Sequence, residues 1–272
     1  MFQTTNRLPA IAAALFAGSL CSNAAVLFQD DFSGLVGDNL NGTTPDVTQG
    51  TTAWVADTEY KADGSGEATP DTNPSIRAYL TLGSLIDDNR GNADAIYTLS
   101  ATVSVTAGTS GQWHAIGFWD NDTPPENFGS NVSGSGTAEG TAWMLRRDNA
   151  ELRVFRGVGT GGGIGESTAS PNNAAGTVDL QVVLDLSDWN GIDNWGSVTY
   201  FAKLSSVSTY TEIAAGELDA ANSTFQAVGI GGGLVAADFD SFELSQIPEP
   251  SSLGLLGIAG VSLLMRRRRQ TR

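Results

Sequence analysis

The chain has 272 residues but only one cysteine and one histidine, and this scarcity excludes several kinds of chemistry. One cysteine cannot form an intramolecular disulfide, and Cys21 with His114 cannot supply a Cys/His zinc site. A Ser-His-Asp triad would have to use His114, which follows Trp113 in a predicted strand with no Gly-x-Ser-x-Gly turn nearby. We therefore interpret His114 as an ordinary strand residue.

Basic residues are also few: the chain has 14 Lys and Arg against 30 Asp and Glu, a formal charge of −16. Six of the basic residues lie near the two ends. This leaves eight basic and 29 acidic side chains in residues 25–247, a formal charge of −21. Because nucleic-acid binding needs Lys and Arg to neutralise phosphates, we exclude a nucleic-acid partner. A body this acidic stays soluble and attracts cations.

The N-terminus has the pattern of a secretory signal peptide. One positive charge, Arg7, precedes an apolar run from Leu8 to Leu20, and small residues follow at Ser22 and Ala24. We predict a signal peptide over residues 1–24, a signal helix that engages the Sec export machinery and is cleaved after Ala24, with Ala25 as the alternative. An uncleaved anchor is disfavoured because the run is short for a membrane span. Lipidation of Cys21 is a weaker alternative.

The C-terminus combines three features in order. Ile247 is followed by Pro248-Glu249-Pro250, then by an apolar run from Leu253 to Met265, and then by Arg266, Arg267, Arg268 and Arg269. The prolines end the preceding strand and hold an extended segment. The apolar run predicts a short hydrophobic helix, and the arginines should stay cytoplasmic, which leaves the body outside. An ordinary tail anchor is the alternative.

These last residues resemble the PEP-CTERM sorting signal of Gram-negative bacteria. The resemblance implies that an exosortase, a membrane protease, recognises Pro248, Glu249 and Pro250 and cleaves near them. It also implies export across the inner membrane, transient anchoring by the C-terminal helix, and a final location in the envelope, at the cell surface or in an exopolysaccharide matrix. The predicted organisation is a signal peptide (1–24), one domain (25–246) and a sorting signal (247–272).

The body alternates apolar and polar residues between Gly, Asn and Asp clusters, and we find no helical period in it. This pattern predicts an all-β fold, a single antiparallel β-sandwich. The glycine-rich segments 157–165 and 229–233 lack the lysine and the following helix of a phosphate loop, so we interpret both as loops between strands. The expected strands are Ser75–Leu82, Ile96–Val105, Trp113–Trp119, Thr141–Arg147, Glu151–Arg156, Val178–Leu186, Val198–Leu204, Phe225–Ile230 and Phe239–Leu244.

Several segments of the body resemble concanavalin A-like (laminin-G-like) jelly rolls. Asp31-Phe-Ser-Gly34, Leu40-Asn-Gly42 and Trp54 resemble the opening of such domains, and residues 113–119 and 225–230 resemble inner strands. Asp238-Phe-Asp-Ser-Phe-Glu-Leu244 resembles the closing strand, which in that fold pairs beside the first.

Glycosidases of this fold carry a Glu-x-Asp-x-x-Glu sequence on one strand, and this chain has none. We expect the body to be non-catalytic.

Two sets of residues are candidate binding sites. If the first and last strands pair, Asp30 and Asp31 come close to Asp238 and Asp240, and clustered carboxylates are suitable ligands for a structural calcium ion. Solvated acidic loops are the alternative, because no fixed spacing marks a calcium motif. The second set is Trp189, Asn190, Asp193 and Trp195, since indole faces beside amides and carboxylates commonly bind a sugar ring. A loop held in place by a buried tryptophan is the alternative.

The sequence therefore favours an exported, non-catalytic surface or matrix protein with a structural or adhesive role. A carbohydrate-binding module that uses the loop tryptophans, with exopolysaccharide as its ligand, is the alternative. A glycoside hydrolase is disfavoured by the missing carboxylate pattern.

Overall fold

The computed structural model describes most of the body, and the description below is restricted to these residues. The predicted signal helix, the residues Pro248–Pro250 and the C-terminal helix with its arginines lie outside them. No helix among the described residues is long and apolar enough to cross a membrane. The described residues are 24–33, 37, 39–50, 52–58, 60–62, 66–70, 76–105, 113–119, 140–147, 152–156, 163–167, 176–218, 224–233 and 237–247.

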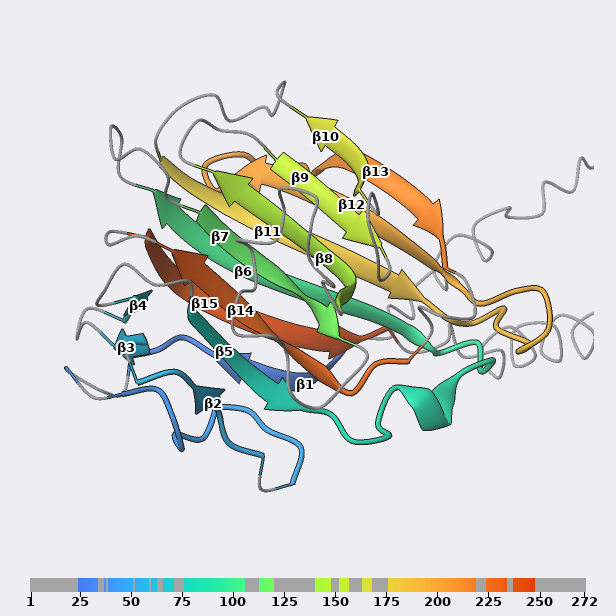
Figure 1. Cartoon of the computed structure of the whole chain (residues 1–272), viewed down its shortest axis with the longest axis horizontal. Helices are drawn as coiled ribbons and strands as arrows, with labels where there is room; N and C mark the ends of the chain where they lie inside the picture. Colours follow the sequence, from blue (N-terminus) through green and yellow to red (C-terminus); the bar gives the residue numbers. More distant parts are fainter. Residues whose placement is uncertain are drawn as a thin grey trace, which may run out of the picture. The chain divides into compact units, whose positions relative to one another are not determined.

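The strands form two antiparallel sheets, as the sequence predicted (Figure 1). Sheet A has the order β13-β12-β11-β6-β15-β4-β3, with β1 also paired to β15. Its strands are β1 (Ala25–Asp30), β3 (Tyr60–Ala62), β4 (Ala68–Pro70), β6 (Ile96–Val105), β11 (Gly176–Asp185), β12 (Ser197–Leu204), β13 (Thr211–Glu217) and β15 (Ala237–Gln246).

Sheet B has the order β10-β9-β8-β7-β14-β5-β2. Its strands are β2 (Val55–Ala56), β5 (Ile76–Thr81), β7 (Trp113–Trp119), β8 (Gly140–Arg147), β9 (Leu152–Arg156), β10 (Gly163–Ser167) and β14 (Ala227–Gly233). One short 3-10 helix, η1 (Asp87–Asn89), lies between β5 and β6.

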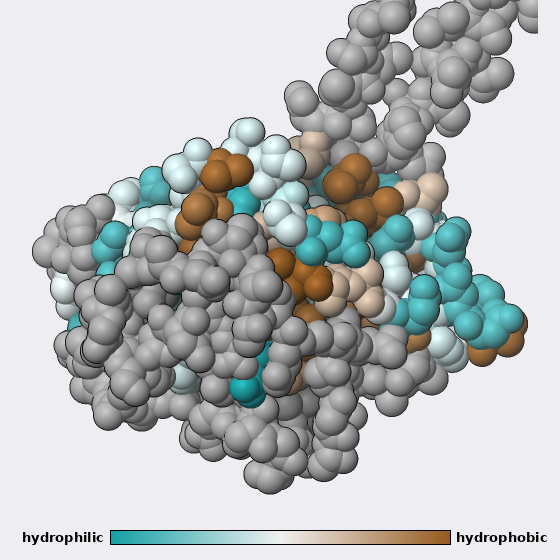
Figure 2. All heavy atoms as spheres, turned by 90° about the horizontal axis from the view of Figure 1, so that it is seen from above, coloured by the Kyte–Doolittle hydropathy of each residue, from teal (hydrophilic) through white to brown (hydrophobic). Residues whose placement is uncertain are grey.

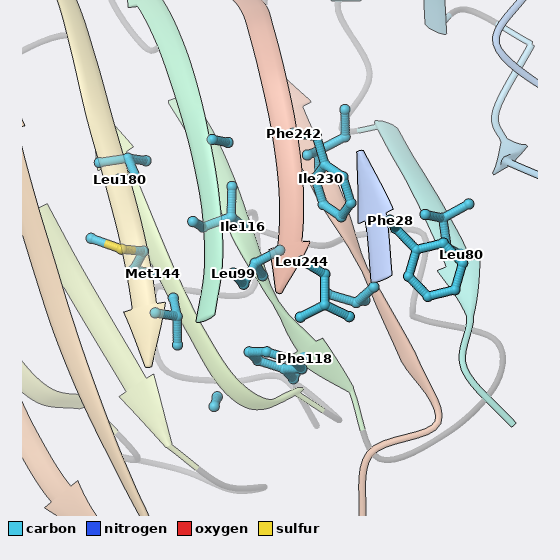
Figure 3. Close-up of a cluster of buried hydrophobic side chains, with 14 of the residues drawn as sticks. Phe28, Leu80, Leu99, Ile116, Phe118, Met144, Leu180, Ile230, Phe242 and Leu244 are labelled. Atoms are coloured by element: carbon cyan, nitrogen blue, oxygen red, sulfur yellow. The ribbon is translucent and has the colours of Figure 1, made fainter. Parts of the chain in front are cut away.

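Strand alternation places one face of each sheet in a shared core. In β6 the side chains of Tyr97, Leu99 and Ala101 are buried, and the residues between them are only partly buried. Successive side chains of a strand point to opposite faces, so this pattern turns one stripe of each strand toward the other sheet. Figure 3 shows the resulting contacts, with Leu99, Leu180 and Phe242 of sheet A near Ile116, Met144 and Ile230 of sheet B.

Most of the expected strands are confirmed with small shifts at their ends. The segments 96–105 and 113–119 become β6 and β7 with the predicted bounds, and the predicted hairpin strands become β8 and β9. Residues 148–150, which were expected to connect them, lie outside the described residues. The closing strand β15 pairs with the first strand β1, as the jelly-roll resemblance implied.

The interpretation of 229–233 as a loop is wrong, because these glycines belong to β14 in the middle of sheet B. A side chain at Gly229 would place its Cβ 2.3 Å from the carbonyl oxygen of Ala78, and one at Gly233 would overlap the indole of Trp113. The glycines are therefore required by close packing and do not mark a turn. The loop interpretation of 157–165 is also partly wrong, since β10 begins at Gly163.

The first residue of β1 and the last residue of β15 lie side by side, so the chain enters and leaves the sandwich at the same place. Ala25 is the register partner of Gln246, and the Ile247 N–H donates to the carbonyl oxygen of Ile96 at 2.8 Å. We call this end of the sandwich, where β6 begins, the tail end. The loop between β11 and β12 also lies there, because Asp185 pairs with Ile96.

Candidate functional site

An acidic cluster forms where β1 ends. Asp30 is 7% exposed, and its two carboxylate oxygens accept hydrogen bonds from the indole Nε1–H of Trp54 at 2.7 Å and from the N–H of Phe32 at 2.8 Å. The Trp54 ring packs edge-on against Phe242, which is the register partner of Asp30. Asp30 therefore belongs to the core side of sheet A, and its partners are part of the core.

Burial raises the pKa of Asp30 above its ordinary value of 3.8. The hydrogen bonds from Trp54 and Phe32 lower it in part, while the charges of Asp46 and Asp31 raise it further. A carboxyl whose pKa is raised on folding binds its proton more tightly in the folded state. The stability that the protonated Asp30 carboxyl contributes is complete below pH 3.8 and is lost as pH rises through its raised pKa, so the ionised Asp30 carboxylate destabilises the fold at neutral pH.

Asp46 completes the cluster and was not among the predicted ligands. The Asp31 N–H donates to Asp46 Oδ2 at 3.0 Å, and the Ser33 N–H donates to Asp31 Oδ1 at 2.9 Å. One carboxylate oxygen from each of Asp30, Asp31 and Asp46 lies within 4.8 Å of the others, the one such group among the described residues. Three hard oxygens at this spacing suit Ca²⁺, which takes six to eight ligands and would draw the rest from carbonyls or water.

The structure does not bring Asp238 and Asp240 into this cluster. A register shift between Phe239 and Ser241 places a bulge at Asp240, and Ser104 donates to Asp240 Oδ2 at 3.4 Å on the outer face of sheet A. Asp238 is the register partner of Ser104. The pairing of β1 with β15 was predicted correctly, but the register puts Phe242 opposite Asp30, so the four predicted carboxylates do not meet.

The second candidate set lies in the loop between β11 and β12, at the tail end. Trp189 and Trp195 are half-buried, and their rings pack edge to face at 6.1 Å. The Arg90 guanidinium lies 5.4 Å from the centre of the Trp189 ring, and Gly91 N–H donates to the Leu186 carbonyl at 2.9 Å. These contacts join the loop to the segment around η1, and the indoles also pack against the main core.

Hydrogen bonds inside this loop occupy the amide that was proposed to bind a sugar. Asn190 Oδ1 accepts from the backbone N–H groups of residues 192, 193 and 194 at 2.9, 3.2 and 3.1 Å. Its Nδ2 donates to Asp193 Oδ1 at 2.8 Å. The loop is therefore rigid and internally bonded, and the geometry favours the alternative in which Trp189 holds it in place. Arg90, which the sequence analysis missed, gives no sequence signal because it lies about a hundred residues from the loop.

His114 lies inside the sandwich and is fully buried. Its ring centre is 5.3 Å from that of Phe239, and its register partner on β8 is Arg146, which is 1% exposed. Burial lowers the pKa of Arg146 to about 10. The histidine is a core residue of β7, within the strand that the sequence predicted.

Comparison with known proteins identifies the tail. The model of the PEP-CTERM protein-sorting motif matches residues 246–269. No curated protein matches the chain. Similar solved structures include the Ca²⁺-bound exoplasmic/lumenal domain of VIP36 (12% identity, 81% of this chain and 93% of that chain, TM-score 0.48) and the carbohydrate recognition domain of Emp47p (12%, 80% and 97%, 0.48). Lectin II from Ulex europaeus is also similar (13%, 81% and 98%, 0.46).

The motif implies export, sorting to the cell envelope and processing by an exosortase. Its first residue, Gln246, is also the last residue of β15. The chain thus carries a PEP-CTERM protein-sorting motif that begins where its β-sandwich ends.

Proposed function

We propose that the chain is a non-catalytic structural or adhesive protein of the cell surface or extracellular matrix, and that the sandwich is the part delivered there. The observation that carries this proposal is the position of the motif relative to the fold. Cleavage after Ala24 and near Pro248–Pro250 would remove both export segments and keep every pairing of β1 and β15. Processing would therefore release a complete sandwich.

The sandwich chemistry supports a role without catalysis. The buried carboxylate of Asp30 is bonded to Trp54 and Phe32, and His114 is enclosed in the core. Neither group has the access that proton transfer to a substrate requires.

Deleting residues 248–272 tests the proposal. The shortened chain keeps β15 and should fold, cross the inner membrane through its signal peptide and appear in the soluble periplasmic or secreted fraction. The full chain should instead be found in the envelope or matrix fraction, as measured by fractionation and immunoblotting. Equal retention of both chains would contradict the proposed role of the tail.

A carbohydrate-binding module is the second candidate, favoured by two half-exposed indoles beside the exposed carboxylate of Asp193. In a glycan array, this function predicts saturable binding by the wild type that Trp195→Ala removes. The thermal midpoint of Trp195→Ala should first be shown to equal that of the wild type, because the indole also packs against the core. Binding that survives the substitution would place any sugar site elsewhere.

We also propose that Asp30, Asp31 and Asp46 bind calcium in the folded protein. A ligand that binds only the folded state stabilises it by about 2.7 kcal/mol at a hundredfold excess over its Kd. The thermal midpoint should rise in millimolar calcium, fall with a chelator and respond less in Asp46→Asn. Asp240→Asn serves as the matched control, since it lies outside the cluster and should respond like the wild type. An equal shift with sodium at matched ionic strength would mean screening alone.

A further inference from the structure

The processing segment begins immediately beside the folded sandwich. The Ile247 backbone is still hydrogen-bonded to Ile96, and Gln246 Nε2 donates to the Asp94 carbonyl at 2.9 Å. Three residue steps separate Ile247 from Pro250, a reach of about 10 Å even when fully extended. This is no more than the width of one α-helix with its side chains, about 10–12 Å.

The membrane also limits the space around the processing segment, because the apolar run follows that segment directly. Five residues, 248–252, lie between Ile247 and the first residue of the apolar run, Leu253. Fully extended, the six steps from Ile247 to Leu253 reach about 22 Å. While that run is in the bilayer, the tail end of the sandwich must stay this close to the hydrocarbon boundary. An enzyme that encloses Pro248–Pro250 therefore has no room to avoid the sandwich.

The tail end displays an apolar side chain suited to such a contact. Ile192, at the tip of the 186–196 loop, is 82% exposed, whereas the other exposed large hydrophobic residues of the described chain are 38–45% exposed. The three bonds to Asn190 Oδ1 and the Trp189–Trp195 packing hold this tip in one conformation. A rigid loop loses little conformational entropy when it binds, which favours recognition.

Charge distinguishes a protein partner from the lipid surface. Asp188 and Asp193, on either side of Ile192, are exposed, and the tip that protrudes at the right of Figure 2 is mostly hydrophilic. Insertion of Ile192 into the lipid interface would carry both carboxylates toward a low-dielectric region. A protein surface with an apolar pocket and a basic rim could bury Ile192 and pair with the carboxylates of Asp188 and Asp193.

We propose that the 186–196 loop, with Ile192 at its centre, docks on the membrane protease that processes the tail, so that the folded sandwich is part of the recognised substrate. This inference rests on the proposed sorting function. It assigns the exposed isoleucine and the internally bonded loop a common role, in which the loop presents Ile192 at the end of the sandwich where the chain leaves β15.

The rate of tail removal in producing cells, followed by pulse-chase and mass spectrometry of the full-length precursor, tests the docking contact. Ile192→Ser should slow processing about tenfold, because it removes an apolar side chain from the contact, and Ile192→Leu should restore the rate. Val207→Ser is the matched control: Val207 is 45% exposed in the turn after β12, at the opposite end of the sandwich, and the change should have no effect. A six-residue Gly-Ser insertion between Ile247 and Pro248 should make processing independent of residue 192.

The possible outcomes separate the two proposals. An unprocessed wild-type tail would contradict the sorting function itself. A processed wild type with an equal rate in Ile192→Ser would overturn the docking contact alone. Binding of the isolated sandwich to lipid vesicles, lost in Ile192→Ser, would also overturn it in favour of a membrane contact. The thermal midpoints of the Ile192 variants should equal that of the wild type, since the Ile192 side chain is exposed.

Discussion

Trp54→Ala is expected to lower the free energy of unfolding by about 4 kcal/mol, within the range measured for large aromatic side chains in protein cores. Trp54 is 1% exposed, and its ring lies 5.0 Å from Phe242 and 6.0 Å from Phe32. The substitution opens a cavity and also leaves the buried carboxylate of Asp30 without the indole donor. Loss of that bond accounts for about 1–3 kcal/mol of this total.

Chemical denaturation of the sandwich measures this effect, and two further variants separate its parts. Trp54→Phe keeps most of the apolar volume and should cost mainly the hydrogen bond. Asp30→Asn removes the titrating group, so the variant should lack the gain in stability that the wild type shows when pH falls through the raised pKa of Asp30. A loss below about 1.5 kcal/mol in Trp54→Ala would show that the opening segment does not complete the core.

Gly117→Ala is the second large effect, with an expected loss of at least about 3 kcal/mol, at the upper end for overpacking. A Cβ at Gly117 would lie 2.2 Å from the Trp143 Cβ and 2.9 Å from the Ala142 carbonyl oxygen. These atoms belong to the neighbouring strand β8, so the backbone must move. Trp143 is itself buried and stacks on Phe155 with ring centres 4.1 Å apart, which leaves it little freedom to give way.

Gly50→Ala is the control for Gly117→Ala. Gly50 has a φ of +70° with nothing within 4 Å of an added Cβ, so its substitution tests backbone strain without a clash. That strain should cost about 1–2 kcal/mol. Thermal melts of the two variants should therefore separate widely, and similar midpoints would mean that β7 and β8 can adjust to the added methyl group.

The long strands could be predicted because alternation is a local property of the sequence. In β6 the buried and partly buried positions follow from the residue types alone, and the bounds of both β6 and β7 agree with the structure. All seven residues of β7 are buried, including His114, which its residue type does not indicate. The continuation of the expected 225–230 strand to Gly233 could not be predicted, because a glycine is required there by the indole of Trp113, which is distant in sequence. Thr211–Glu217, which became β13, has mostly partly buried and exposed positions and gives no clear pattern.

The candidate sites show the same limit. The pairing of β1 with β15 followed from the order of the jelly-roll strands, but the residue pattern does not mark the bulge at Asp240, which places Phe242 and not Asp240 opposite Asp30. Asp46 comes from an irregular segment and reaches the cluster through the bridge between Gln29 and Val47, which no periodic pattern reveals. The sorting motif was predictable, at 247–272 against the matched residues 246–269, because its recognition depends on the order of adjacent residues.

The masses of both termini of the mature protein, isolated from the envelope or matrix of producing cells, test the central claim most directly. The account predicts an N-terminus at Ala25 or the next residue and a C-terminus near Pro248–Pro250, without Arg266–Arg272. Such a chain contains every residue of β1 and β15 apart from one at most. An intact C-terminus ending at Arg272 on the mature wild-type protein would contradict it.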